Sequence, residues 1–391
     1  MLRACLIVQN HPCVLMGGAQ YQGHLLAEEL ARREGVEVTY LARDIPPQLA
    51  TSSGLPYAVR SIGTWQGIRR RAAFFDARDL WRALCELKPD VIYQQMRQSY
   101  TAVCARYASK AGVPFFFQIA SDFDLDRTWI TNGISANLPF DVAEAIAGIQ
   151  GLRNASHIIA QTSRQERVLR ERFGREAAAV VRNFQPLPAR LPSKARTPVE
   201  VFWVANIKEV KRPELFVQLA EAFSGRNDLK FTMAGRPSPL RQRYRPLMER
   251  IARTANLEYL GELPIEAVNQ RMAQAAIHVN TSSVEGFPNT FIQAWANGAV
   301  VVTLGVDPYD EGMEKLGIGI CAKTFEQLRN SIAELAHAPQ RRLAIAATAF
   351  AFAHANHSLS QGAQLADMML HAATEAARAR RSGALPRMRS C

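Results

Sequence analysis

The sequence predicts an α/β protein built from two doubly wound, Rossmann-like domains, each with a parallel sheet between helices. Two observations support this class. Short apolar runs alternate with helical patterns in both halves of the chain, and a proline-rich segment separates the halves. The length of 391 residues is large for one domain and suits two. With 48% hydrophobic residues, each domain has enough apolar side chains for a core of its own.

The first half carries the alternation from Arg3 to about Asn183. Short apolar runs of this kind are typical of buried parallel strands, and the stretches between them have the spacing of helices. The clearest strands are expected at Leu6–Val8, Val36–Leu41, Asp90–Tyr93, Pro114–Phe117 and His157–Ala160, and the clearest helices at Tyr21–Arg33 and Gln165–Phe173.

Four prolines between Phe184 and Pro198 predict a linker, because proline continues neither a helix nor a sheet. The alternation then resumes, with strands expected at Val199–Val204, Lys230–Ala234, Leu257–Leu260, Ile277–Asn280 and Ala299–Thr303. We therefore expect a first domain at 1–185, a linker at 186–198 and a second domain at 199–355. Residues 356–391 would form a closing helix, part of an alanine-rich amphipathic stretch from about Gln340 to Ala379, and a basic tail.

Composition narrows the functional classes. The formal net charge of +12 suits anionic ligands, anionic lipid headgroups or nucleic acid, although it also fits a surface charge without function. No nucleic-acid-binding motif accompanies the charge, so nucleic acid is not expected as a partner. The six cysteines are scattered and predict thiols in a reducing cytosol. The chain has no long apolar run and begins with a strand-like segment, so a cytoplasmic protein is expected.

The segment Ser282–Gly298 is the most informative part of the chain. It lies between two strand-like runs, and Pro288 and Asn297-Gly298 are typical of a helix start and a helix end. The order is therefore strand, acidic loop, helix and strand. The N–H groups at the start of that helix suit a phosphate, whereas Glu285 suits neutral hydroxyls beside the phosphate. A phosphorylated sugar offers both groups.

This segment resembles the nucleotide-sugar signature of the retaining glycosyltransferases of family 4, which have the GT-B fold. Glu285 matches the first of the two glutamates of that signature, and Gln293 stands where the second is usual. The resemblance implies that Glu285 binds sugar hydroxyls and that Gln293 binds the ribose through its amide. The donor would also contact the residues between them, namely Gly286, Phe287, Pro288, Asn289 and Thr290. It further implies two domains facing a central cleft, with a C-terminal helix that crosses back to the first domain.

Further matches to the family lie in both halves. Gly17 and Gly18 resemble its glycine loop after the first strand, next to the donor diphosphate or the acceptor. Lys211 fits its phosphate-binding lysine, whereas Asn206 replaces the usual arginine, for which Lys208 or Arg212 would compensate. The remaining donor contacts implied by the resemblance are Gly235 near the nucleotide, Arg236 on a phosphate and the backbone at Leu263 beside the base.

The first half departs from the family where many members carry a histidine after the fifth strand. Ala120 or Ser121 stands there, and Asp122 follows as the expected polar group facing the acceptor. Asp122–Asp126 also contains two Asp-x-Asp triplets, which in the GT-A fold hold a divalent metal against a diphosphate. Because the context is different here, we expect no metal and no other cofactor.

The expected function is transfer of a sugar from a nucleoside diphosphate sugar to a glycan or lipid-linked acceptor with retention of configuration. The pathway would be synthesis of cell-surface polysaccharide or lipopolysaccharide. Glu285, Lys211 and Asp122 are the expected catalytic residues. The alternatives are a nucleotide-sugar epimerase of GT-B-like fold and a catalytically silent sugar-binding subunit. The latter is suggested by Asn206, Gln293 and the missing histidine of the first half.

Basic and aromatic residues alternate between Trp65 and Arg82, and arginines recur in the tail from Arg378 to Arg389. An amphipathic helix with Arg69–Arg71 at a headgroup plane would bind an anionic membrane surface. An ordinary helix packed on the sheet explains the first pattern equally well. The sequence therefore leaves peripheral membrane binding open as an addition to a cytoplasmic location.

Overall fold

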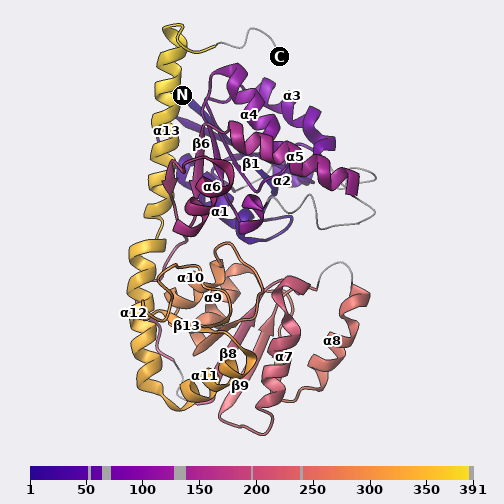
Figure 1. Ribbon diagram of the computed structural model, residues 1–391, viewed down its shortest axis with the longest axis vertical. Coiled ribbons are helices and arrows are strands. Elements are labelled where there is room, and N and C mark those ends of the chain that lie inside the picture. Colours follow the sequence, from indigo (N-terminus) through magenta and orange to yellow (C-terminus); the bar gives the residue numbers. More distant parts are fainter. Residues whose placement is uncertain (52–53, 64–71, 127–137, 195–196, 238–240, 387–391) are drawn as a thin grey trace. The chain divides into compact units, whose positions relative to one another are not determined.

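The computed structural model describes residues 1–51, 54–63, 72–126, 138–194, 197–237 and 241–386. Two compact units are present: Met1–Phe184 with Leu359–Cys391, and Gln185–Ser358. Each unit contains one parallel sheet with helices against its faces (Figure 1). The expected α/β class with two doubly wound domains is confirmed.

The first unit contains a seven-stranded sheet in the order β3-β2-β1-β4-β5-β6-β7. The order reverses between β1 and β4, which pair in parallel through Ala4–Ile7 and Val91–Gln94. In such sheets, ligands bind beyond the carboxyl ends of the strands at the point of reversal. The strands are β1 (Leu2–Asn10), β2 (Val36–Arg43), β3 (Ala58–Ser61), β4 (Val91–Gln95), β5 (Phe115–Gln118), β6 (His157–Ala160) and β7 (Ala179–Val180).

Apolar side chains on both faces of this sheet are covered by helices, which explains why its strands are almost continuously apolar. One face packs against α1 (Gly18–Ala31) and α13 (Ser360–Arg381). The helices of the other face are α3 (Ala77–Leu87), α4 (Ser99–Ala111), α5 (Leu138–Asn154) and α6 (Ser163–Phe173). Short elements complete the unit: α2 (Pro47–Thr51) and the 3₁₀ turns η2 (Ala73–Asp76) and η3 (Asp122–Leu125).

The second unit repeats this plan with a six-stranded sheet in the order β10-β9-β8-β11-β12-β13. Its point of reversal lies between β8 and β11. The strands are β8 (Val199–Val204), β9 (Leu229–Ala234), β10 (Leu257–Tyr259), β11 (Ile277–Asn280), β12 (Val300–Leu304) and β13 (Gly319–Ala322). The helices are η5 (Glu209–Lys211), α7 (Pro213–Ala222), α8 (Arg241–Arg253), α9 (Ile265–Gln274), α10 (Asn289–Ala296), α11 (Phe325–His337) and α12 (Pro339–His357).

The alanine-rich end of the chain is two helices rather than the single stretch expected from Gln340 to Ala379. α12 ends at His357, the chain passes through Ser358 and Leu359, and α13 begins at Ser360. Leu365, Ala366 and Met369 of α13 are buried in the core that the first sheet shares with α1. The expected return of the C-terminal helix to the first domain is therefore confirmed.

The segment from Trp65 to Arg82 is only partly described, because residues 64–71 lie outside the described residues. Its later part forms η2 and the start of α3, whose Leu80 is buried against the sheet. Cys5, Cys13, Cys104 and Cys321 are free thiols. Cys85, however, is disulfide-bonded and is an exception to the expectation that the cysteines are mostly thiols. The basic tail beyond residue 386 also lies outside the described residues.

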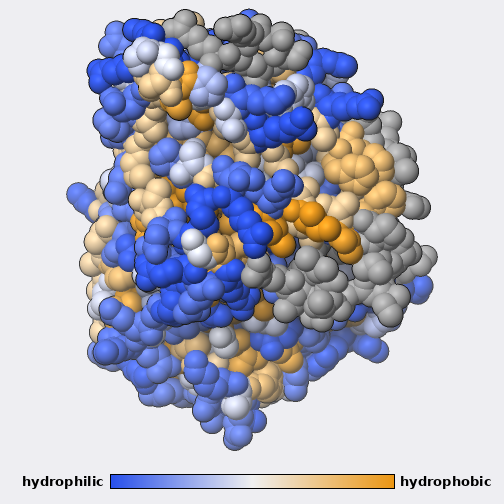
Figure 2. Space-filling model, turned by 45° about the horizontal axis from the view of Figure 1, so that its top comes forward, coloured by the Kyte–Doolittle hydropathy of each residue, from blue (hydrophilic) through white to orange (hydrophobic). Residues whose placement is uncertain are grey.

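The described helices include none that is long and apolar enough to cross a membrane. Hydrophilic side chains cover much of the face seen in Figure 2, and apolar side chains gather in smaller areas between them. The large apolar side chains exposed on the first unit include Phe123 and Ile146, at 46% and 55% of their area.

Candidate functional site

The segment Ser282–Gly298 has the predicted structure of loop and helix between β11 and β12. Pro288 precedes the first residue of α10 in an extended conformation, and no side chain caps the helix N-terminus. At the other end, Asn297 caps the helix and Gly298 has a φ of +72°, which glycine adopts without strain. The loop therefore leaves β11 at the point of reversal of the second sheet and leads to an uncapped helix start.

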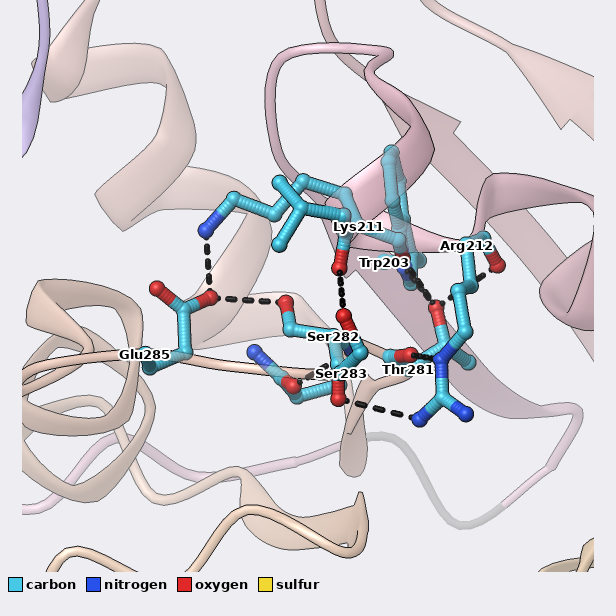
Figure 3. A network of polar contacts seen from close by, with 9 residues as sticks. Trp203, Lys211, Arg212, Thr281, Ser282, Ser283 and Glu285 are labelled. Atoms are coloured by element: carbon cyan, nitrogen blue, oxygen red, sulfur yellow. Dashed lines mark hydrogen bonds and ion pairs between the residues drawn. The ribbon is translucent and has the colours of Figure 1, made fainter. Parts of the chain in front are cut away.

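Lys211 and Glu285 are brought together by this arrangement (Figure 3). Lys211 ends η5, the turn that follows β8, and Glu285 lies on the loop after β11. Lys211 Nζ donates to Glu285 Oε1, which also accepts from Ser282 Oγ at 2.7 Å. Both charged side chains keep part of their area exposed, 23% and 15%. A cation for a phosphate and a carboxylate for hydroxyls thus stand side by side.

Arg212 has a different role from the one expected. Its Nε donates to Thr281 O at 2.6 Å, and its Nη2 donates to Ser282 O at 3.0 Å and Leu304 O at 2.9 Å. The guanidinium is thus occupied by two backbone carbonyls directly after β11 and by the carbonyl of the last residue of β12. The suggestion that Arg212 compensates for Asn206 at a phosphate is therefore not supported.

Lys208 remains a candidate for that compensation. Partial burial and the neighbouring charges of Lys211 and Arg236 lower the pKa of its ammonium. Lys208 therefore lies in a region of positive potential, which an anion would stabilise. Arg236 is also 3.7 Å from Glu262, in an exposed ion pair that water screens.

Thr281 and Trp203 support the site, and the sequence analysis did not identify them. Trp203 Nε1 donates to Thr281 Oγ1 at 3.0 Å, and Thr281 Oγ1 donates to Lys211 O at 2.7 Å (Figure 3). Ser283 N adds a bond to Val210 O at 2.8 Å. These bonds fasten η5 to the loop after β11. The sequence feature that could have indicated this role is the run of one threonine and two serines directly after the strand Ile277–Asn280.

Gly235 is required by close packing. Its φ is +147°, and a Cβ built there would lie 1.8 Å from Ala205 O. The same Cβ position is 3.6 Å from Asn206 N, so Gly235 and Asn206 are neighbours at the ends of β9 and β8. Leu263 is partly buried against the core of α9 and α10.

Gln293 and Phe287 are buried, with 7% and 6% of their areas exposed. Gln293 Nε2 donates to Asn269 Oδ1 of α9 at 3.0 Å. Phe287 packs against His357 at a ring-centroid distance of 4.8 Å and against Tyr309 at 5.9 Å. Phe287 thus packs the loop between β11 and α10 against the end of α12.

In the first unit, Gly17 is the N-cap of α1, and Gly18 is its first residue. Gly17 has an extended φ of −156°, and an added Cβ would meet only the end of the Gln20 side chain. The loop before it is held by His11, whose carbonyl accepts from Val14 N at 2.9 Å and whose Nδ1 accepts from Cys13 N at 3.2 Å.

His11 also connects this loop to neighbouring segments. Because Nδ1 is an acceptor, His11 Nε2 carries the proton and donates to Tyr57 OH at 3.0 Å. Tyr57 OH is then left to donate to His24 Nδ1 on α1 at 2.6 Å. Burial and the neighbouring His24 lower the pKa of His11 to about 4, so its ring is neutral at pH 7. His11 and His24 thus both bond to Tyr57 and hold the loop after β1 against α1.

The carboxylates of Asp122–Asp126 are each engaged by cations or N–H groups. Asp122 Oδ2 is 3.8 Å from Arg164 Nη2, and Asp126 Oδ1 is 3.7 Å from Arg172 Nη1. Asp124 accepts from the backbone N–H groups of residues 97, 120 and 121. Burial raises the pKa of Asp122, and Arg164 opposes this. The described residues include no group of His, Cys, Asp or Glu side chains suited to a metal ion.

Comparison with known proteins identifies the family. A model of the glycosyl transferase 4-like domain matches residues 17–183, and a model of the glycosyl transferases group 1 matches residues 198–338. The chain belongs to the group 1 glycosyltransferases. It is a nucleotide-sugar glycosyltransferase of the retaining, metal-independent family 4. A comparison with curated proteins finds no match.

Solved structures share its GT-B fold. Anabaena HepE in complex with UDP and glucose has a TM-score of 0.72 at 16% identity, over 95% of this chain and 100% of that one. Sucrose-phosphate synthase from Thermosynechococcus elongatus has a TM-score of 0.78 at 15% identity, over 95% and 98%. WaaG, a glycosyltransferase involved in lipopolysaccharide biosynthesis, has a TM-score of 0.73 at 14% identity, over 94% and 99%.

Proposed function

We propose that the enzyme transfers a sugar from a nucleoside diphosphate sugar to a glycan or lipid-linked acceptor, with the donor bound at Lys211 and Glu285. The observation that carries this proposal is the meeting of a lysine and a glutamate at the point where the second sheet reverses. Open parallel sheets bind ligands at this point. HepE, which has the same fold, binds UDP and UDP-glucose in its solved structures.

The reaction breaks the bond between the anomeric carbon and an oxygen of the diphosphate. A new bond forms to an acceptor hydroxyl on the same face of the sugar, and the acceptor proton passes to the departing diphosphate. Lys211 would neutralise the charge that develops on the leaving group, with Lys208 and Arg236 adding positive potential. Glu285 would exchange its contact with Lys211 for the hydroxyls of the transferred sugar.

Asp122 is proposed to face the acceptor. Its raised pKa and its position after β5 fit a polar group near the carboxyl edge of the first sheet. The role is secondary, because the departing diphosphate can itself accept the proton. Asn206, Gly235, Arg236, Leu263 and Gln293 are proposed donor contacts together with residues 286–290, and Gly17 and Gly18 are proposed contacts in the first unit.

A panel of nucleotide sugars tests the donor proposal. A true donor raises the melting temperature, since binding to the folded state stabilises it by RT ln(1 + [L]/Kd). The stabilising donor should also undergo slow hydrolysis or transfer. Conversion of that donor to its epimer would favour the alternative of an epimerase. Tight binding with an unchanged donor would favour the silent subunit.

We also propose that the enzyme acts in synthesis of cell-surface polysaccharide or lipopolysaccharide and visits the inner face of a membrane. The support is the net charge of +12 and the exposed Phe123 and Ile146. Basic and apolar side chains together bind anionic headgroups. WaaG, a protein of the same fold, is involved in lipopolysaccharide biosynthesis. The described part of the chain would lie on such a surface, since its helices include no candidate span.

A further inference from the structure

The point of reversal of the first sheet has Gly17 and Gly18 as proposed contacts, but the side chains at its strand ends have no assigned role. It lies between β1 and β4, in the same topological position that Lys211 and Glu285 occupy in the second sheet. The carboxyl ends of the strands there are the expected place for a ligand. The side chains at these ends therefore indicate what the first unit can bind.

Glutamines end the strands on one side of this point. Gln95 is the last residue of β4, Gln118 is the last residue of β5, and Gln161 directly follows β6. Gln95 and Gln118 are register partners in the parallel pairing. All three are buried, with exposed fractions of 0%, 2% and 1%.

Gln95 and Gln118 lie on the face of the sheet that α1 and α13 cover. Tyr93 and Phe116 belong to the core beneath α1, and side chains alternate along a strand, so residues two positions later share that face. Tyr93 OH accordingly donates to Gln118 Oε1. Because α1 follows the parallel strand β1 and packs back along the sheet, its first turn at Gly18 lies at the carboxyl end.

Some of these carboxamide atoms have no hydrogen-bond partner among the residues that the structure describes. Gln95 Nε2, Gln95 Oε1 and Gln161 Oε1 are all buried without a hydrogen bond. An unsatisfied buried polar atom costs about 1–3 kcal/mol, so an apolar residue would be more stable at position 95. The neighbouring Gln94 shows the contrast, since its Nε2 donates to Gln95 O at 2.9 Å and its Oε1 accepts from Thr101 at 3.0 Å.

The backbone after Gln95 is also unusual. Met96 has a φ of +71°, a conformation that residues other than glycine rarely adopt. Such strain occurs mainly where the surrounding structure holds a binding or catalytic site in place. The unpaired amide and the strained residue are thus adjacent in the chain.

We propose that Gln95 and Gln161 bind hydroxyl groups of a neutral sugar acceptor at the carboxyl ends of β4 and β6, on the face that α1 and α13 cover. This inference rests on the proposed function for the identity of the ligand as acceptor. A hydroxyl is the matching group, because it can accept from Gln95 Nε2 and donate to Gln95 Oε1 at the same time. Both carboxamides are uncharged, whereas a binding site for a phosphate or a carboxylate favours positively charged side chains.

Gln95→Met tests the site, because methionine fills a similar volume without polar atoms. A binding role predicts an unchanged or higher melting temperature together with an acceptor KM raised roughly tenfold, the effect of losing about 1.4 kcal/mol. The donor KM should not change. A more stable variant with an unchanged acceptor KM would overturn the proposal and make Gln95 structural.

The matched control is Thr303→Val in β12. Thr303 Oγ1 is also buried and unpaired, but it lies in the second sheet, and valine has the same shape. This variant should be equally or more stable, with both KM values unchanged.

A measurement of sugar binding alone distinguishes a failure of this proposed site from a failure of the proposed function. Saturation-transfer NMR with neutral methyl glycosides should detect binding to the wild-type chain and weaker binding to Gln95→Met, whether or not transfer occurs. Binding of a glycoside without any transfer would contradict the proposed function and leave the site intact. Equal binding to both proteins, or binding to neither, would overturn the site.

Discussion

At the scale of single residues, the site depends on a few side chains whose partners the sequence could not disclose. Lys211 and Glu285 were predicted from their resemblance to a motif, and the structure brings them into contact. Arg212 was one of two residues suggested to compensate for Asn206, with Lys208, but it binds three backbone carbonyls. A sequence reveals which groups are charged, whereas the direction of an arginine depends on the fold around it.

Gly235 allows a direct test of close packing at the site. Gly235→Ala should destabilise the protein by several kcal/mol, because the added Cβ would overlap Ala205 O and the backbone would have to move. The measurement is the free energy of unfolding in denaturant. Gly225→Ala is the control, since Gly225 also has a positive φ, +87°, but nothing lies within 4 Å of its Cβ position. Equal losses in the two variants would contradict the packing argument.

At the scale of elements, the strands and helices were largely predictable, since apolar periodicity and glycine or proline signals are local. The helix after Pro288 begins and ends where Pro288 and Asn297-Gly298 predicted. The break between α12 and α13 was missed, because Ser358 and Leu359 carry no strong stop signal in a run of helix formers. The hydrogen bonds from His11 to Tyr57 and from Tyr57 to His24 join segments that are distant in sequence, and the spacing of apolar residues cannot reveal such contacts.

The His11 contacts predict an acid-sensitive first unit. The pKa of His11 is about 4 in the folded protein, below its usual value of 6.5, so the unfolded chain binds more protons between these values. Stability should therefore fall as pH drops from about 6.5 to 4, by up to about 1.4 kcal/mol for each unit of pKa difference.

Melting temperatures over this pH range check the prediction. Buried His278, whose pKa is also lowered to about 4, should contribute in the second unit. His11→Asn should therefore reduce the pH dependence without abolishing it, whereas replacement of the exposed His371 should not change it. An unaltered slope in His11→Asn would contradict the assignment.

The turn η3 leads to a prediction about metals. The carboxylates of this turn and of Asp126 directly after it contact Arg164, Arg172 and backbone N–H groups, so transfer should continue in EDTA. The rate of sugar transfer is measured with EDTA and then with added Mn²⁺. Loss of activity in EDTA that Mn²⁺ restores would return the Asp-x-Asp triplets to a metal-binding role.

At the scale of the whole molecule, the two sheets have the same order of strands around their points of reversal. The polar groups near the carboxyl ends of the strands differ between them. The second sheet ends in charged groups suited to a diphosphate sugar, and the first ends in uncharged carboxamides. The fold and the donor motif were predictable, because the motif is contiguous in sequence. The glutamine edge was not, since its residues come from strands brought together only by the sheet order.

The net charge of +12 predicts salt-sensitive binding to anionic vesicles. Each cation near an anionic surface contributes about 1 kcal/mol, and salt screens this attraction within about 10 Å at 0.1 M. Sedimentation with phosphatidylserine vesicles should show binding at low salt and loss at high salt. Neutral phosphatidylcholine vesicles serve as the control. Absence of binding at low salt would indicate a soluble acceptor.

The central claim is that donor chemistry depends on the carboxylate beside Lys211. The most direct measurement is the rate of sugar transfer by Glu285→Gln, which keeps the shape of the side chain and removes its charge. We predict that kcat and kcat/KM fall together by about 100-fold or more, with the melting temperature nearly unchanged. Glu258→Gln, which removes an exposed ion pair with Lys230, should retain full activity. Near-normal turnover in a folded Glu285→Gln enzyme would contradict the claim.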